Sequence, residues 1–139
     1  MGMYTKYYGT INISSLVTYK DRLELYKKRL EEFKKQFENK YTNYEFRSYI
    51  VDDLALITGI NGCINIVFTG EIKNYNNEVD ILYQELAKEF PQGEGIMYSQ
   101  YEEAEYPTIY VLTHGSLVPC QVYIEMKGHG NSCGVEKGE

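Results

Sequence analysis

The sequence predicts an α+β fold: a mostly antiparallel sheet with two amphipathic helices on one face, in the order β-α-β-β-α-β-β-β. Three observations lead to this prediction. Two segments carry apolar residues at helical spacing, several others alternate apolar and polar residues, and an Asn-Gly dipeptide separates two apolar runs. Each helical segment has a single apolar stripe, so both can pack on the same face of a sheet. Residues 1–127 are expected to form one domain, and residues 128–139 a flexible C-terminal tail.

The first strand is expected over Tyr4–Ile13, where an alternation of period two places the large apolar residues on one side. These residues are Tyr7, Ile11 and Ile13. Gly9 interrupts the strand and predicts a β-bulge.

The first helix is predicted over residues 19–38. Its apolar residues are spaced 3, 4, 3 and 4 positions apart, which aligns them in one stripe. They are Leu23, Tyr26, Leu30, Phe33 and Phe37. Thr18 followed by Asp21 resembles a capping box, and Asn39 is expected to end the helix in a left-handed conformation.

The segment after this helix predicts a strand and then a hairpin. From Tyr44 to Thr58 the pattern is that of a strand, which Asp52 and Asp53 interrupt with a bulge or a break near an edge. Asn61-Gly62 then lies between two apolar runs, which is typical of a β-hairpin. The return strand of this hairpin is expected over Cys63–Thr69.

The second helix is predicted to begin at Asn77, acting as the N-cap, and to end at Glu89 before Pro91. Its apolar stripe consists of Val79, Leu82, Leu86 and Phe90. Residues 70–77 are polar and rich in Asn, and we expect a loop there.

Three further strands are expected over Ile96–Tyr101, Thr108–Thr113 and about Leu117–Met126. An acidic stretch, residues 102–105, connects the first two of these strands. Pro119 in the last strand favours an edge position, because proline cannot donate a backbone hydrogen bond to a neighbour.

The composition favours a protein partner. The chain has 139 residues, with 14 Lys or Arg against 20 Asp or Glu, and a formal net charge of −6. Direct binding of nucleic acid depends on Lys and Arg, so this balance disfavours it and favours a basic protein instead. The sequence has neither an apolar run of membrane-spanning length nor a signal-peptide pattern, and its three cysteines form no paired framework. We therefore expect a cytoplasmic protein with reduced thiols and no membrane contact.

Tyrosine is unusually frequent, with 15 Tyr and no Trp. Half-buried rings in a sheet account for such a count, and so does a protein-binding face, where Tyr is enriched. Composition alone does not separate these two interpretations.

No catalytic centre is predicted. The sequence lacks a phosphate-binding loop, and its His and Cys residues lack the paired spacing of a zinc site, so we expect no metal and no cofactor. Five acidic residues could in principle hold Mg²⁺ for phosphoryl chemistry, but almost no Lys or Arg lies near them to hold a phosphate. These acids are Asp52, Asp53, Glu102, Glu103 and Glu105. The chain is predicted not to be an enzyme, and a small enzyme with a carboxylate-based site is kept as an alternative.

Much of the chain, roughly residues 4–118, resembles the Immunity protein 7 family of bacterial polymorphic toxin systems. The resemblance rests on short motifs: Tyr8-Gly9-Thr10-Ile11, Asn61-Gly62, Gly70, Pro91, Gly95, Tyr98, Glu102-Glu103, Ile109-Tyr110-Val111-Leu112 and Gly115. The chain departs from the family's pattern at Thr10, where the family favours Trp, and at Thr113-His114, where it favours basic residues. The Asn-His pair expected after Gly70 is replaced by a displaced Asn74-Tyr75. The resemblance implies a small α+β protein that binds and silences a toxin and that has no catalytic residues.

The resulting hypothesis is an immunity protein that occludes the surface of a basic, nuclease-type toxin. A phage-encoded inhibitor of a bacterial defence effector is the alternative, and it would work in the same physical way. The partner-binding residues are predicted to be Glu102, Glu103 and Glu105 with Tyr98 and Tyr101. Asp52 and Asp53, with the tyrosines of the first strands, are a second candidate location. The sequence predicts no oligomeric state.

Overall fold

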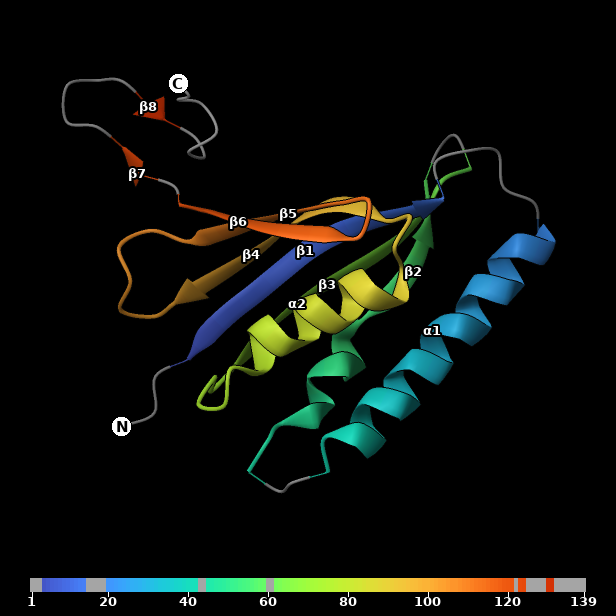
Figure 1. Cartoon of the computed structure of the whole chain (residues 1–139), viewed down its shortest axis with the longest axis horizontal. Helices are drawn as coiled ribbons and strands as arrows, with labels where there is room; N and C mark the ends of the chain where they lie inside the picture. The colour runs from blue at the N-terminus through green and yellow to red at the C-terminus, as the bar shows by residue number, and fades with distance from the viewer. Residues whose placement is uncertain are drawn as a thin grey trace.

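Six antiparallel strands form one sheet in the spatial order β2-β3-β1-β4-β5-β6, and two α-helices pack on it (Figure 1). A computed structural model of the chain describes residues 4–14, 20–42, 45–59, 62–121, 123–124 and 130–131. The strands are β1 Thr5–Ser14, β2 Ala55–Thr58, β3 Ile64–Ile72, β4 Glu94–Tyr101, β5 Thr108–Thr113 and β6 Ser116–Gln121. The helices are α1 Lys20–Lys40 and α2 Glu78–Glu89, with a short 3₁₀ helix, η1, over Ser48–Asp53. A second, two-stranded sheet pairs β7 Tyr123–Ile124 with β8 Gly130–Asn131.

The predicted α+β class is confirmed, and so is the order of the main strands and helices. The segment from β1 to β4 follows the β-α-β-β-α-β order of the split β-α-β, or ferredoxin-like, arrangement, in which β1 lies between β3 and β4. The hairpin of β5 and β6 extends this sheet beyond β4. β6 is an edge strand, as Pro119 predicts.

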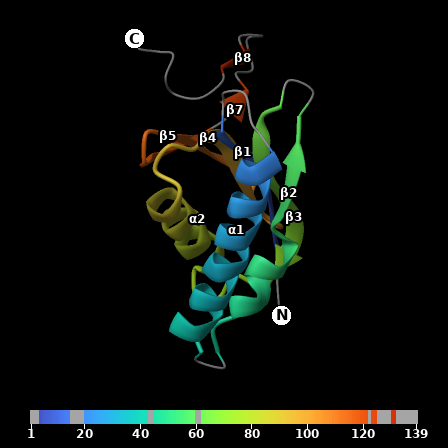
Figure 2. The same ribbon diagram turned by 90° about the vertical axis from the view of Figure 1, so that its right-hand side faces the viewer.

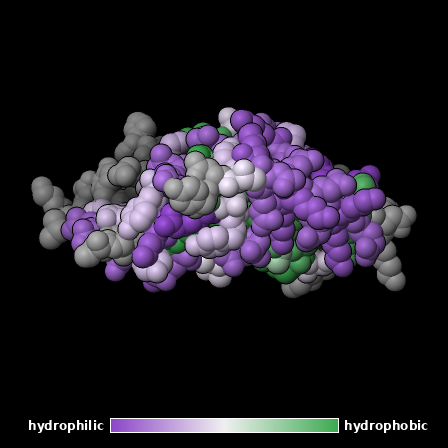
Figure 3. All heavy atoms as spheres, turned by 90° about the horizontal axis from the view of Figure 1, so that it is seen from below, coloured by the Kyte–Doolittle hydropathy of each residue, from purple (hydrophilic) through white to green (hydrophobic). Residues whose placement is uncertain are grey.

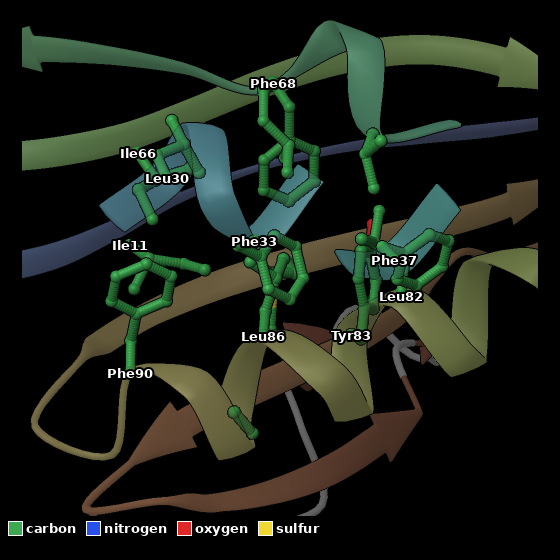
Figure 4. Packing of buried hydrophobic residues seen from close by; sticks show 14 of the residues in the cluster. Ile11, Leu30, Phe33, Phe37, Ile66, Phe68, Leu82, Tyr83, Leu86 and Phe90 are labelled. Atoms are coloured by element: carbon green, nitrogen blue, oxygen red, sulfur yellow. The ribbon is translucent and has the colours of Figure 1, made fainter. Parts of the chain in front are cut away.

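Both helices lie on the same side of the sheet (Figures 1 and 2). The predicted stripes are buried, except that Leu23 is only partly buried. Leu30, Phe33 and Phe37 of α1 meet Leu82 and Leu86 of α2 above the sheet residues Ile11, Ile66 and Phe68 (Figure 4). The rings of Phe33 and Phe90 lie 6.3 Å apart between the two helices. Burial of these apolar side chains holds the helical layer on the sheet.

The first strand has the predicted faces, but the bulge is elsewhere. Tyr7, Ile11 and Ile13 are buried, whereas the register irregularity of β1 lies between Asn12 and Ser14 and not at Gly9. Gly9 pairs in register with Phe68 and with Met97. A Cβ at this position would lie 2.9 Å from the Met97 Cα. Close approach of β4 therefore accounts for the glycine.

The predicted strand around Asp52 and Asp53 was wrong in its first part. Residues 48–53 form η1, and only Ala55–Thr58 form a strand. Ile50, Val51 and Leu54 are buried while both aspartates are exposed. This spacing of one and then three residues is helical, and it overrides the short apparent alternation. The predicted hairpin is present as the antiparallel pair β2 and β3, although Asn61 lies outside the described residues.

Two predicted helix ends also differ. Asn39 lies inside α1, which continues to Lys40, because Phe37 and Tyr41 extend the aromatic packing with ring centroids 4.8 Å apart. Asn77 is the N-cap of α2 with φ 60°, but its side chain makes no cap hydrogen bond. The Asn74 Oδ1 accepts the Val79 N–H at 2.9 Å instead. The proposed cap at Thr18 lies outside the described residues.

Two strand ends were placed wrongly by the sequence patterns. β3 continues through Gly70 to Ile72, where a loop was predicted, because Ile72 is buried in register with Thr5. β6 ends at Gln121, earlier than predicted for the last strand.

Candidate protein-binding surface

The face of the sheet opposite the helices is the main candidate surface. Alternate residues of each strand point to this side, which we call the open face, because no helix of the described part of the chain packs on it (Figures 1 and 2). The strand register assigns its residues to rows that run across the sheet.

Two neighbouring rows are largely apolar and form what we call the apolar band. One row runs through Ala55, Val67, Thr10, Ile96, Val111 and Val118, and the next through Thr69, Tyr8, Tyr98, Ile109 and Cys120. Ile96 is 45% exposed and Val118 is 49% exposed. A contiguous apolar stretch of this kind, bordered by polar residues, is typical of a protein-interaction site.

Tyr8 and Tyr98 are stacked at the centre of the band. Their ring centroids lie 4.6 Å apart with an interplanar angle of 11°, and Tyr8 is 37% exposed. Below them, the buried Tyr83 hydroxyl donates to the Tyr98 carbonyl oxygen at 2.5 Å. Burial raises the pKa of Tyr83, so its hydroxyl stays neutral and keeps this bond. The backbone of Tyr98 is therefore held to α2 by a hydrogen bond.

A shallow groove of about 720 Å³ crosses β3, β1 and β4 beside this pair. The residues of the open face that line it are Tyr8, Thr10, Asn12, Val67, Thr69, Glu94, Ile96 and Tyr98. Gly9 and Gly95 also line it, and a Cβ at Gly95 would fall 2.0 Å from the Thr10 carbonyl oxygen. The glycines therefore let β1 and β4 approach closely beneath the groove.

Both ends of the band carry acidic residues. Glu94 lies in the row beyond Ile96, with Asn12 and Thr113. At the other end, Glu71 and Gln100 flank Lys6 across the sheet, and Glu102 lines the same small pocket as these three. Lys73 lies at this second end too, with its Nζ 5.5 Å from the centroid of the Tyr4 ring. The band therefore has carboxylates at both ends, which can pair with a basic partner.

The acidic connection between β4 and β5 lies at one end of the sheet, and its three glutamates are exposed. The Glu102 Oε1 accepts the Tyr4 N–H at 2.9 Å, which ties the connection to the start of β1. Tyr98 and Tyr101, predicted to act with these glutamates, point to opposite faces of β4 because three positions separate them. Tyr98 pairs with Tyr8 on the open face, whereas Tyr101 pairs with the buried Thr5.

Asp52 and Asp53, the second predicted location, lie on η1 with the helical layer and not on the open face. The Tyr7 hydroxyl donates to the Asp53 Oδ2 at 2.5 Å, and a Cβ at Gly70 would lie only 2.5 Å from that hydroxyl. Partial desolvation and a hydrogen bond to Asp52 raise the pKa of the Glu38 carboxyl. These contacts connect η1 to β1 and α1, so both aspartates have structural partners.

The residues considered for catalysis do not converge. Within the described part of the chain, no three His, Cys, Asp or Glu side chains are grouped so that they could hold a metal ion. His114 lies beside Glu94, with 3.8 Å between Nε2 and Oε2, and Cys63 is a free thiol. His129 and Cys133 lie outside the described residues.

The surface over α1 provides a contrast with the open face. Seen from below, the molecule is mostly hydrophilic, with hydrophobic residues visible in a few small areas (Figure 3). On α1, Glu24 with Lys27 forms an exposed ion pair, and Glu31 pairs with the half-buried Lys34. α1 therefore resembles an ordinary solvated helix on its outer side.

The sequence analysis named Tyr98 and the tyrosines of the first strands as candidates but not the rest of the apolar band. Each strand's alternation was visible in the sequence, whereas the order of the strands in the sheet was not. Val67, Thr10 and Ile96 belong to three strands that become neighbours only in the folded sheet. Glu94 was missed because the strand predicted there began two residues later.

Comparisons with protein-family models, with curated proteins and with solved structures gave no match for this chain. Among the described helices, none is both long and apolar enough to cross a membrane.

Proposed function

We propose that this protein is a non-catalytic inhibitor that binds a basic protein and occludes its working surface, as an immunity protein does with a nuclease-type toxin. The observation that carries the proposal is the apolar band, which is exposed on one face of a six-stranded sheet and has acidic residues at both ends. The resemblance to the Immunity protein 7 family supplies the class of partner.

The physical case for inhibition by occlusion has two parts. Exposed Tyr, Ile and Val side chains supply the area that is buried on binding, and the surrounding carboxylates steer a basic partner and pair with it. A nuclease must be basic where it grips nucleic acid, so an acidic protein that covers this surface competes directly with the substrate.

Co-expression with a candidate toxin tests the proposal. The candidate is the product of the gene next to this one, expressed in a host whose growth it arrests. We expect this chain to restore growth, and we expect Ile96→Asp to abolish the rescue because it puts a charge in the middle of the apolar band.

Leu25→Asp is the matched control, since Leu25 is also an exposed apolar residue, 59% exposed, on the outer side of α1. Circular dichroism of both variants verifies that they are folded. Rescue by the folded Ile96→Asp variant, or no rescue by the wild type, would contradict the proposal. In the alternative, the partner is an effector of a bacterial defence system instead of a toxin, and the mode of binding is the same.

A further inference from the structure

We propose that the groove beside Tyr8 and Tyr98 receives an arginine side chain of the basic partner, with the guanidinium over the aromatic pair and paired to Glu94. This inference rests on the proposed function, because it names the chemical group by which the partner is recognised. Three properties of the groove support the inference: its aromatic wall, its single charged residue and its apolar floor.

The aromatic wall suits a flat cation. Tyr8 and Tyr98 stack at 4.6 Å and both line the groove, so a group lying there meets tyrosine rings. A cation over the face of an aromatic ring is attracted by the ring's quadrupole. The guanidinium is planar and weakly hydrated, and it stacks on aromatic rings better than the ammonium group of lysine does.

The charge in the groove has the sign that an arginine requires. Glu94 is the only charged residue that lines it in the described part of the chain, and its side chain is 60% exposed. Its neighbour His114, at 3.8 Å, is itself 83% exposed and leaves the carboxylate open to a partner. A carboxylate can accept two parallel hydrogen bonds from one guanidinium, which a lysine cannot supply.

The floor of the groove suits the aliphatic stem of the same side chain. Val67 and Ile96 lie on either side of Thr10 in one row of the apolar band. Long basic side chains bury their methylene groups along apolar surface while the charged end pairs elsewhere. One arginine can therefore use the floor, the rings and the carboxylate together.

A nucleotide fits the same groove less well. Exposed aromatic rings on a sheet can also stack nucleic-acid bases, as in sheet-based RNA-binding modules. Such binding needs Lys or Arg for the phosphates, and no basic residue lines this groove within the described chain. Glu94 would repel a phosphate, so the charge favours a protein partner over RNA.

Titration of the purified full-length protein with synthetic peptides tests the inference. The probes are a nine-residue peptide of alternating Arg and Gly, its Lys counterpart, and a nine-nucleotide single-stranded RNA. NMR spectra of the ¹⁵N-labelled protein locate the binding site. We expect the Arg peptide to shift the amide signals of Tyr8, Glu94 and Tyr98, and to bind more tightly than the Lys peptide.

Two matched variants separate a specific site from general attraction. Glu94→Gln and Glu32→Gln each remove one exposed negative charge, but only Glu94 lines the groove, whereas Glu32 lies on α1. We expect Glu94→Gln to weaken binding of the Arg peptide about tenfold and Glu32→Gln to change it less than about twofold. Tyr8→Leu should weaken it as well, since leucine keeps the apolar contact but removes the ring.

Equal effects of the two Gln variants, equal binding of Arg and Lys peptides, or RNA binding in the groove would each overturn the inference. The outcome for the proposed function is read separately in the growth assay. If Glu94→Gln rescues growth as well as the wild type does, the proposed function stands and the arginine site is wrong. If the Arg peptide binds in the groove but no rescue occurs, the site stands and the proposed inhibitor function is wrong.

Discussion

The two faces of the sheet are built from alternate residues of the same strands, yet they differ in chemistry. On the covered face, β1 and β3 present Tyr7, Ile11, Ile66 and Phe68, all buried under the helices. On the open face the same two strands present Lys6, Tyr8, Thr10 and Val67. Because successive side chains of a strand point to opposite faces, a strand can stabilise the fold with one set of residues and leave the other set available for recognition.

This comparison gives the two faces separate roles. Substitutions on the covered face should change stability, because they remove packed atoms or internal hydrogen bonds. Substitutions on the open face should leave stability nearly unchanged and alter binding. The predictions below test this division, beginning with the largest expected effect.

Alkaline pH should unfold the protein through the tyrosines of the covered side. Tyr7, Tyr83 and Tyr110 have pKa values raised by burial, and the bonds of Tyr7 to Asp53 and of Tyr110 to Asp80 raise theirs further. Because the pKa of each is higher in the folded state than in the unfolded state, their contribution to stability is fully present below about pH 10 and is lost as the pH rises through the folded-state pKa.

The measurement is a pH titration followed by circular dichroism and by ultraviolet absorbance of tyrosinate. We expect the last tyrosines to ionise together with the loss of secondary structure. Complete ionisation of the 15 tyrosines in a protein that stays folded would contradict the prediction.

The second prediction compares one substitution on the two faces. Ile66→Ala on β3 should lower the free energy of unfolding by about 2–5 kcal/mol, because Ile66 is fully buried and its removal leaves a cavity. Ile96→Ala on β4 should lower it by less than about 1 kcal/mol, since that residue is already 45% exposed in the folded protein. Urea unfolding of both variants gives the two values, and similar losses would mean that the open face is part of the core.

The third prediction concerns two adjacent tyrosines of β1. Tyr7→Phe removes the hydroxyl that donates to Asp53 and should cost about 1.5–3 kcal/mol, as expected for a hydrogen bond to a charged group. Tyr8→Phe, one residue further along on the open face, should change stability by less than about 0.5 kcal/mol. Thermal unfolding at neutral pH compares them, and an equal loss for both would remove the distinction between the faces.

The sequence could predict the covered side well and the open face only in part. The helical stripes and the strand Thr108–Thr113 were recognised from periodicity, since each signal lies within one segment. η1 was missed because Ile50, Val51 and Leu54 form too short a segment for its helical spacing to stand out. The apolar band could not be predicted, because it depends on which strands become neighbours in the sheet.

A triple substitution in the acidic connection tests whether the binding surface extends from the open face onto this connection. Reversing Glu102, Glu103 and Glu105 to Lys changes the net charge from −6 to 0, since each reversal adds two positive charges. All three side chains are exposed, and the hydrogen bond from Tyr4 to Glu102 can be replaced by water. We expect the free energy of unfolding to change by no more than about 1 kcal/mol.

Binding should respond more clearly than stability to this triple reversal. If the connection steers a basic partner toward the open face, the association rate should fall about tenfold at low salt and lose most of its salt dependence, while the dissociation rate changes little. The matched control reverses Glu24, Glu31 and Glu32, three exposed residues of α1, and reaches the same net charge on the far side of the molecule. Stopped-flow kinetics at two salt concentrations measure both variants. An equal decrease for both variants would mean that net charge alone sets the association rate. A decrease only for the variant of the acidic connection would place that connection at the rim of the binding surface. The apolar band would then determine the dissociation rate.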